Sequence, residues 1–414
     1  METVLGFFRR IIPDPILNAV RKPYHYTLAV LAATFYRFPA RKLKVIGVTG
    51  TNGKSTTANL IAAILEADGK RVGLSTTVNF WVGPKDKRLN HTKMTSLGRF
   101  QMQRLLRKMV KAGCTHAVIE VSSHALHWNR VWGIPFETAV FTNLSRDHLD
   151  LHGSMDAYRK TKGKLFDSLN AAADGQTVSV VNGDDPVAPY FIEFFADTKY
   201  VFGTSEAATE IMPLAHTVIA KNVQADATGS RFTAQAEDVR IPVKLGLPGR
   251  FNVSNVLAAI SVGLAYRVDP KKIATALEQV EGVPGRMERV DAGQPFPIIV
   301  DYAHTPDAFK NVLSTLRDLT SGKLISVYGA TGDRDRGKRP ELGKIAATFS
   351  DYMILTEEDP GSEDPLDIIE EIRPGFEQAE KDTPYEVEPN RRKAIRMALE
   401  RAKKADTVVL LAKG

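Results

Sequence analysis

The stretch that most constrains the fold of this chain is residues 44–57, KVIGVTGTNGKSTT. It begins as a short apolar run rich in β-branched residues, which is typical of a buried strand, and it leads into a second apolar run that is typical of a helix. Between the two lies a glycine-rich turn that closes on Gly-Lys-Ser. A strand, a tight turn and a helix N-terminus direct backbone N–H groups at one point, where the helix dipole adds positive potential. The stretch therefore predicts a site for a nucleoside triphosphate.

Two side chains of this turn carry the expected chemistry. Lys54 can reach the β- and γ-phosphates of the nucleotide, and the Ser55 hydroxyl can ligate Mg²⁺. The spacing departs from the standard pattern, because Val48 occupies the position of its first glycine. A glycine turn before an ordinary helix is the alternative, but the strand, the turn, the lysine and the hydroxyl all fall in register. The residues predicted to contact ATP here are Gly50, Thr51, Asn52, Gly53, Lys54, Ser55 and Thr56.

The rest of the first half alternates between strand-like and helix-like patterns, which predicts a mostly parallel sheet with helices on both faces. Ligands of such sheets bind at the C-terminal ends of the strands. Glu120 and Asn143 come at such ends, as the phosphate-binding turn does. The predicted strands are residues 71–77, 116–121 and 136–143, the predicted helices are 99–111, 154–165 and 252–265, and residues 216–245 are expected to form an antiparallel patch.

A second α/β unit is expected after Gly-Val-Pro-Gly at residues 282–285, which is typical of a domain boundary. The chain is thus expected to have three parts: a basic arm over residues 1–44, a central ATP-binding domain with a P-loop-type α/β fold over 45–282, and a Rossmann-like α/β domain over 283–414. In the last part the predicted strands are 298–301, 324–328, 352–355 and 407–411, and the predicted helices lie near 306–317, 340–348, 365–372 and 391–403.

Composition and charge exclude several classes of protein. The apolar and charged fractions, 43% and 25%, are ordinary for a globular protein. The single cysteine, Cys114, excludes internal disulfides, and its neighbours favour buried packing over reactivity. The net charge of +7 is concentrated in residues 1–44, which hold eight Lys/Arg against two acidic residues. No nucleic-acid-binding motif accompanies this local charge, so no nucleic-acid partner is expected.

The large apolar side chains of the arm over residues 1–44 include Phe7, Phe8, Ile11, Ile12, Tyr24, Tyr26, Phe35, Tyr36 and Phe38. Its longest apolar run, 26–36, is shorter than the ~20 residues that span a bilayer, and the prolines before it are not typical of a secretory signal. A helix lying on an anionic membrane surface is one interpretation. A helical arm packed on the body, with its charges in solvent, is the other and is slightly favoured. A third role, in which the arm's cations bind a substrate diphosphate, suits the aromatic residues less well.

Two further loops of the first half combine charge with strand ends. Glu120 opens the sequence EVSSH, where a carboxylate can ligate the Mg²⁺ of the nucleotide. Residues 143–153 hold two histidines, two aspartates and an arginine. His148 and His152 could bind zinc on a helix, but Gly153 and the strand-end position argue against a regular helix, so a phosphate- and metal-binding loop is preferred. The helix after it carries Lys160, Lys162 and Lys164, and spacing alone does not choose among them.

The C-terminal unit contains a second candidate anion-binding loop. Residues 329–340, GATGDRDRGKRP, pack four cations and two aspartates between glycines after a predicted strand. A solvated charged loop is the simple alternative. If the two units close on each other, however, this loop faces the first across a cleft. One unit would then hold ATP and the other a second, anionic substrate.

Taken together, these motifs resemble the Mur ligase family, whose members use ATP to add amino acids to cell-wall precursors. The resemblance covers roughly residues 44–411 and is strongest to the UDP-N-acetylmuramoyl-tripeptide synthetase branch, which adds the third residue of the stem peptide. The motifs that carry it are TGTNGKS at 49–55, EVSSH at 120–124, NxxxDHxDxHG at 143–153, NVSN at 252–255, GRME at 285–288, DYAH at 301–304 and GDRDxGKRP at 332–340.

The resemblance implies a site and a mechanism. ATP would phosphorylate a substrate carboxylate, and the amine of an amino acid would then displace the phosphate. The implied catalytic residues are Lys54, His148, Lys162 and Arg286. The implied Mg²⁺ ligands are Ser55, Glu120, His148 and Lys162, the last as a carbamate. The implied ATP contacts outside the turn are Asn252, Asn255, Asp301 and His304. The implied substrate contacts are Thr95, Ser122, Arg130, Lys338, Arg339 and Asp359.

Three departures from the family pattern leave the added amino acid and the nucleotide-sugar contact open. The arm stands in place of the UDP-binding N-terminal domain. The Asp-Asn-Pro-Arg motif of the diaminopimelate enzymes appears as Glu358-Asp359-Pro360-Gly361. The sequence ends at Gly414, whereas that branch continues beyond the corresponding position, so a truncated C-terminus is expected.

The expectation is a monomeric cytoplasmic ligase that binds a nucleotide-sugar peptide and an amino acid, with peripheral membrane contact through residues 1–44 as one role of the arm. A folylpolyglutamate synthetase-like ligase and a non-catalytic nucleotide-binding scaffold are the rival interpretations.

Overall fold

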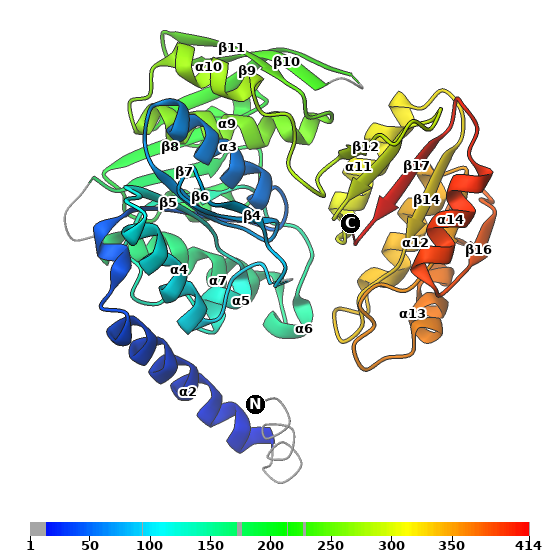
Figure 1. Ribbon diagram of the computed structural model, residues 1–414, viewed down its shortest axis with the longest axis horizontal. Coiled ribbons are helices and arrows are strands. Elements are labelled where there is room, and N and C mark those ends of the chain that lie inside the picture. The colour runs from blue at the N-terminus through cyan, green and yellow to red at the C-terminus, as the bar shows by residue number, and fades with distance from the viewer. Residues whose placement is uncertain (1–13, 93, 172–175, 213, 227–228, 414) are drawn as a thin grey trace.

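The two runs of alternating strands and helices form two separate sheets, with the N-terminal helix projecting from the first (Figure 1). The computed structural model describes residues 14–92, 94–171, 176–212, 214–226 and 229–413. The prediction of two mostly parallel α/β sheets is confirmed.

The first sheet has eleven strands in the order β11-β10-β9-β8-β7-β6-β1-β5-β2-β3-β4. The seven strands from β9 to β2 run parallel, and antiparallel strands extend the sheet at both edges. The strand before the phosphate-binding turn, β1, lies in the middle, so the turn opens at the centre of the C-terminal edge. The bounds are β1 (Lys44–Thr49), β2 (Val72–Ser75), β3 (Asn79–Val82), β4 (Lys87–Leu89), β5 (His116–Glu120), β6 (Phe136–Phe141), β7 (Val178–Asn182), β8 (Thr198–Gly203), β9 (His216–Asp226), β10 (Gly229–Ala236) and β11 (Val239–Leu245).

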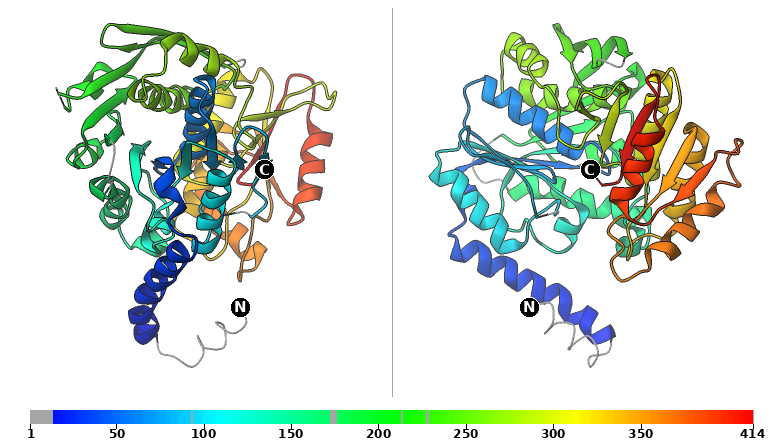
Figure 2. Two further views of the ribbon diagram at one scale, coloured as in Figure 1. Left: turned by 60° about the vertical axis from the view of Figure 1, so that its left-hand side comes forward. Right: turned by 45° about the vertical axis from the view of Figure 1, so that its right-hand side comes forward.

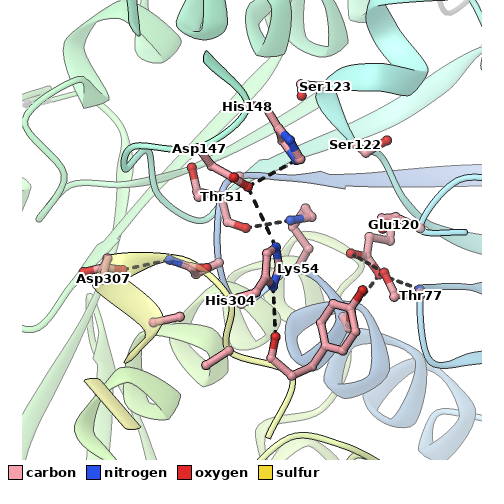
Figure 3. A pocket seen from close by; sticks show the side chains of 18 of the residues that line it. Thr51, Lys54, Thr77, Glu120, Ser122, Ser123, Asp147, His148, His304 and Asp307 are labelled. Atoms are coloured by element: carbon pink, nitrogen blue, oxygen red, sulfur yellow. Dashed lines mark hydrogen bonds and ion pairs between the residues drawn. The ribbon is translucent and has the colours of Figure 1, made fainter. Parts of the chain in front are cut away.

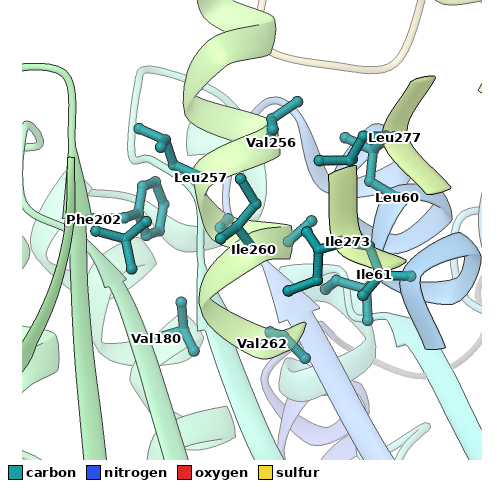
Figure 4. Close-up of a cluster of buried hydrophobic side chains, with 14 of the residues drawn as sticks. Leu60, Ile61, Val180, Phe202, Val256, Leu257, Ile260, Val262, Ile273 and Leu277 are labelled. Carbon is teal, nitrogen blue, oxygen red and sulfur yellow. The ribbon is translucent and has the colours of Figure 1, made fainter. Parts of the chain in front are cut away.

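Helices cover both faces of this sheet, and each layer has its own apolar core. On one face α3 (Lys54–Ala67), α9 (Arg250–Ala265) and α10 (Pro270–Glu278) pack on the strands, as Figure 4 shows. The other face carries α4 (Arg99–Lys111), α5 (Ser123–His127), α7 (Met155–Asp167) and α8 (Ala188–Ile192). Cys114 is buried in this second core, as predicted.

The C-terminal sheet has six strands in the order β12-β13-β17-β14-β15-β16, and only β12 is antiparallel. Its four predicted strands occur at the predicted bounds. The elements are β12 (Glu288–Val290), β13 (Ile298–Asp301), β14 (Leu324–Tyr328), β15 (Tyr352–Leu355), β16 (Tyr385–Val387), β17 (Thr407–Leu411), α11 (Pro306–Leu319), α12 (Lys338–Phe349), α13 (Pro365–Ile372) and α14 (Arg391–Arg401).

Two parts of the first sheet differ from the sequence prediction. Strands β7 and β8 were not predicted, although both are buried within the sheet. Residues 216–245 form antiparallel pairs as expected, but β9 also runs parallel to β8. The patch is therefore the edge of the main sheet and not a separate unit.

The described part of the arm is a 22-residue helix, α2 (Asp14–Phe35), followed by a 3-10 turn, η1 (Pro39–Lys42), that leads into β1. Ala29, Ala32 and Ala33 bury the C-terminal half of α2 against the body. Its N-terminal half extends away from the body in the views of Figure 1 and Figure 2. The arm thus packs on the body, as favoured, over part of its length. Phe7, Phe8, Arg9, Arg10, Ile11 and Ile12 of the predicted arm lie outside the described residues.

None of the helices in the described ranges is long and apolar enough to cross a membrane.

Candidate functional site

The C-terminal edges of the two sheets face each other across a cleft of about 1020 Å³. Figure 3 shows the centre of this cleft. Residues from both sheets line it, including every residue predicted for the site except Arg339. The sequence motifs, which span about 310 residues of chain, therefore converge on one place.

The phosphate-binding turn is shaped by two glycines that no other residue could replace without a clash. Gly50 has a φ of 154°, and a Cβ there would lie 1.9 Å from Thr142 Oγ1. Gly53 has a φ of 80°, and its Cβ would lie 2.2 Å from Asn255 Oδ1. The turn is fastened to the end of β6, because the Thr51 backbone N–H donates to the Asn143 carbonyl over 2.8 Å. Asn252 and Asn255 lie beneath it and hydrogen-bond each other at 3.0 Å.

Lys54 begins α3 and points its ammonium group into the turn. Its Nζ donates to the Thr51 carbonyl over 2.7 Å. Burial lowers the pKa of Lys54, Arg286 lowers it further, and Glu120 and Asp147 oppose the shift. Because the side chain is half-buried and its one hydrogen bond stays within the turn, it is available to a phosphate group.

Ser55 and Glu120 form a pair of oxygen donors beside Lys54. The Ser55 hydroxyl donates to Glu120 Oε2 over 2.7 Å, and Thr77 donates to the same carboxylate through its backbone N–H, at 2.8 Å, and its hydroxyl. Arg286 reaches across from the C-terminal unit to within 3.3 Å of Ser55 Oγ. A hydroxyl and a buried carboxylate at a phosphate-binding turn are the hard oxygen ligands that Mg²⁺ prefers, so these residues fit the ion.

The described residues contain no group of three His, Cys, Asp or Glu side chains arranged to hold a metal. The donor set of the cleft is of another kind. It combines a hydroxyl with one carboxylate, and a nucleotide would supply the remaining oxygen ligands, as is usual for Mg²⁺.

Asp147 is the centre of a charged cluster that joins the two units. His148 Nε2 lies 3.1 Å from its carboxylate, and Lys338 and His304 of the C-terminal unit lie at 3.7 and 3.9 Å. Burial raises the pKa of Asp147, but these three neighbours and Lys54 hold it below its usual value. Burial lowers the pKa of His148 to about 2, so its imidazole is neutral and able to ligate a metal.

The loop that carries His148 contains one turn of helix, which the sequence argued against. This turn, α6 (Leu149–His152), follows His148, whose φ of 54° sets the entry into it. The two histidines have different polar partners. His148 contacts Asp147, whereas His152 Nε2 lies 3.1 Å from Ser123 Oγ.

Lys162 is the lysine of α7 that reaches the cleft. Only 1% of it is exposed, and its Nζ donates to the Gly50 carbonyl over 2.6 Å and lies 4.3 Å from the centre of the Tyr158 ring. Burial lowers its pKa well below the usual value, and Lys54 adds to the shift. In contrast, Lys160 is exposed and pairs with Asp156. Of the three lysines that spacing alone could not distinguish, Lys162 is therefore the one that lines the cleft.

The residues predicted to contact the substrate lie together, between β5 and the segment before α4. Ser96 Oγ lies 3.1 Å from Ser122 Oγ, and the Arg130 guanidinium donates to the Ser96 carbonyl over 3.1 Å. Ser122 also caps the N-terminus of α5. Thr95 lines the cleft beside them.

The C-terminal unit contributes its own strand ends. Asp301 is buried and accepts backbone N–H groups of Met287 and Ala303, both over 2.7 Å, so it shapes the turn that carries Arg286. Asp359 lines the cleft and pairs with Lys413 at 2.6 Å. Burial raises the pKa of Glu358, its neighbour, to about 7.

Arg339, predicted as a substrate contact, does not reach the cleft. Its side chain is 1% exposed and is held by Glu363 and Glu371 at 2.8 and 2.7 Å. The neighbouring Lys338 faces the cleft instead. Adjacent residues of a helix point about 100° apart, so the loop's cations divide between the cleft and the interior of the C-terminal unit.

Arg339→Ala is therefore expected to act on stability. It should lower the free energy of unfolding by about 2 kcal/mol, because Glu363 and Glu371 each lose a buried cationic partner and retain the more exposed Arg336. Urea unfolding followed by circular dichroism measures this, and the Michaelis constants should stay unchanged. Arg373→Ala removes a solvent-exposed pair with Glu370 and should have no measurable effect. A stable R339A variant with a raised Michaelis constant would contradict the assignment.

Comparison with known families decides what kind of site this is. Residues 48–263 match the Mur ligase middle domain, and residues 285–414 match the glutamate ligase domain of the same family. The chain belongs to the Mur ligase family. It is accordingly an ATP-dependent ligase that forms amide bonds.

Two curated Mur ligases illustrate the similarity. The UDP-N-acetylmuramyl-tripeptide synthetase of Roseiflexus sp. is 43% identical, with 97% of this chain and 79% of that protein covered. The UDP-N-acetylmuramoyl-L-alanyl-D-glutamate–2,6-diaminopimelate ligase of Syntrophomonas wolfei is 42% identical, with 94% of this chain and 76% of that protein covered.

Solved Mur ligase structures agree with the fold. A UDP-N-acetylmuramoyl-L-alanyl-D-glutamate–2,6-diaminopimelate ligase structure superposes with a TM-score of 0.60 at 33% identity, covering 90% of this chain and 73% of that one. The folylpolyglutamate synthase of Mycobacterium tuberculosis gives a TM-score of 0.71 at 18% identity, covering 100% and 95%. At that identity the second likeness shows the fold alone.

Several cleft residues of this Mur ligase were not assigned from the sequence. Thr77 binds Glu120, Tyr158 packs against Lys162, and Glu358 lies beside Asp359. Thr77 and Tyr158 are single polar residues in ordinary surroundings, so no motif marked them. Glu358 was marked by its motif, but its buried position was not visible in the sequence.

Proposed function

We propose that this Mur ligase adds diaminopimelate to UDP-N-acetylmuramoyl-L-alanyl-D-glutamate. The observation that carries the proposal is the single cleft in which the phosphate-binding turn, the Asp147 cluster and the Glu358-Asp359 strand end meet. The names of relatives about 40% identical over most of their length support the choice of substrates. The enzyme would work in the cytoplasm as a monomer, where ATP and nucleotide-sugar precursors are available.

The proposed division of labour follows the two sheets. Residues 45–282 would bind ATP through Lys54, Ser55, Asn252 and Asn255, and the dipeptide through Thr95, Ser122 and Arg130. Residues 283–414 would bring Arg286, Asp301 and His304 to the nucleotide, and Asp359 and Lys338 to the amino acid. The interdomain pairs around Asp147 and Ser55 support this arrangement.

The proposed reaction has two steps. The terminal carboxylate of the dipeptide attacks the γ-phosphorus of ATP, so that ADP leaves and an acyl phosphate forms. The amine of the amino acid then attacks the acyl carbon, losing a proton as phosphate departs. Lys54 and Arg286 would stabilise the charge that develops on the phosphoryl oxygens, and closure of the cleft would keep water from the acyl phosphate.

Mg²⁺ would be held by Ser55 and Glu120, with His148 and a carbamate on Lys162 at a second position, and would neutralise phosphate charge. The neutral state of His148 and the hard oxygens of the first pair support this assignment.

Glu358 is proposed to receive the incoming ammonium group. Its carboxyl has a pKa near that of a proton acceptor working at neutral pH, because burial raises it to about 7. Asp359 beside it is held by Lys413. Arg334 lines the same end of the cleft and offers a cation for the second carboxylate of diaminopimelate, since Gly361 occupies the arginine position of the family motif.

An acceptor panel tests the proposal. Purified enzyme with ATP, Mg²⁺ and UDP-N-acetylmuramoyl-L-alanyl-D-glutamate should release phosphate at least about tenfold faster with meso-diaminopimelate than with L-lysine. The missing carboxylate of lysine would leave a cation of the site unpaired, which costs on the order of 1–3 kcal/mol. Equal rates, or turnover only with a folate and glutamate, would refute the proposal.

A further inference from the structure

Helix α2 presents a second apolar side that is largely exposed in the described structure. Ala29, Ala32 and Ala33 face the body, and on the opposite side Tyr24, Leu31 and Phe35 are 45%, 54% and 73% exposed. These three residues are spaced seven and then four apart, so they form one stripe along the helix. A soluble helix normally turns polar side chains to that side.

The stripe continues onto a second helix. The Phe35 and Phe100 rings lie 6.4 Å apart, centre to centre, and Phe100 of α4 is 42% exposed. Of the eleven large apolar side chains that are exposed in the described parts of the chain, four belong to this stripe, whereas Tyr26 lies on the other side of α2 against Trp132. Such clustering marks an interaction surface, whereas scattered exposure would need no explanation.

Helix α4 adds positive charge to the same surface. Arg104, Lys108 and Lys111 follow Phe100 at helical spacing and are exposed. Exposed cations also flank the stripe on the N-terminal segment, namely Lys22, Arg37, Arg41 and Lys42. We call Tyr24, Leu31, Phe35, Phe100, Arg104, Lys108 and Lys111 together the α2–α4 face.

Acidic residues are absent from the segments that build this face. The chain has no Asp or Glu between Asp14 and Glu66, and none between Asp86 and Glu120. Over the described residues, none of the face's cations forms an ion pair. The face therefore carries uncompensated positive charge around an apolar stripe.

We propose that the α2–α4 face binds the surface of an anionic phospholipid bilayer. The aromatic and leucine side chains would enter the interfacial region, and the cations would contact lipid phosphates. A second copy of the chain suits the face poorly, because pairing two such faces would bring like charges together. The proposal is independent of the reaction in the cleft, since no residue of the face lines it.

Flotation of the full-length protein with vesicles tests the proposal. The protein should bind equimolar phosphatidylcholine–phosphatidylglycerol vesicles, should not bind pure phosphatidylcholine, and should be released by high salt. The double variants L31E/F35E and R104E/K108E should each weaken binding at least about tenfold, the first by losing apolar contact and the second by losing charge.

Matched variants control for general effects of the substitutions. L214E/F195E changes one exposed leucine and one exposed phenylalanine elsewhere, and R240E/K271E reverses one exposed arginine and one exposed lysine elsewhere. Both should bind vesicles like the wild type. Thermal unfolding and ligase activity of all four variants should match the wild type, because every substituted side chain is exposed and outside the cleft.

Three results would overturn the proposal. The first is wild-type protein that fails to float with the anionic vesicles, and the second is L31E/F35E that floats equally well. The third is a wild-type dimer in sedimentation equilibrium that L31E/F35E converts to monomer, which would assign the face to a second copy of the chain.

Discussion

Lys54→Ala is expected to reduce ligation at least about a thousandfold, because it removes the one cation that the phosphate-binding turn itself supplies to the transferred phosphoryl group. The loss should appear in kcat with saturating ATP, since charge on the phosphoryl oxygens is greatest in the transition state. Phosphate release in the presence of both acceptors measures it.

The fold of this variant should be preserved. Lys54 is half-buried, and its hydrogen bond to the Thr51 carbonyl is the only one it makes among the described residues. Lys44→Ala, at the exposed start of the strand β1 that leads into the turn, is the matched control and should keep full activity. Wild-type turnover by K54A would remove the assignment of the turn.

Lys162→Ala is expected to be nearly inactive, with at least a hundredfold loss of kcat, and to recover part of its activity with added acetate or formate. The reason is the environment of Lys162, in which burial and then Lys54 lower its pKa well below that of an ordinary lysine and so favour the neutral amine. A neutral amine can attack carbon dioxide. A nitrogen–carbon bond then forms, one proton leaves to solvent, and the resulting carbamate carries one negative charge.

The recovery separates this role from a structural one. A short carboxylate can replace the carbamate oxygens in the space that the alanine leaves, but it cannot restore the contact of the Lys162 Nζ with the Tyr158 ring. Lys160→Ala, two residues away on the exposed side of α7, should behave as the wild type. An intact mass without the additional carbon dioxide, together with no rescue by carboxylates, would count against carbamylation.

The sequence predicted the elements that have strong periodicity or clear ends. Helix α4 has the predicted bounds, because Gly98 precedes it and an apolar stripe runs through it. The four predicted C-terminal strands also match, since each is a short apolar run bounded by polar residues. Strands β7 and β8 escaped prediction because runs of five or six largely buried residues cannot be told from core helix segments by period alone.

The same distinction applies to the site. Motifs at strand ends could be placed in one cleft, because parallel sheets put those ends at one edge. The sequence could not predict that Lys338 faces the cleft while Arg339 is buried in the C-terminal unit. These directions depend on where α12 begins, and it begins two positions before the predicted helix. The pairing of Arg146 with Asp335 and Glu341 likewise depends on how the two units meet.

Asn52 belongs to the phosphate-binding turn and also contacts the C-terminal unit. Its side-chain amide donates to Asp307 over 2.8 Å and accepts from the Thr305 hydroxyl over 3.1 Å, while its backbone belongs to the phosphate-binding turn. We therefore expect nucleotide affinity and the position of the C-terminal unit to be thermodynamically linked. Linkage is reciprocal. If the amino acid substrate favours this arrangement of the units, it raises the affinity for the nucleotide by a certain factor, and the nucleotide raises the affinity for the amino acid by the same factor.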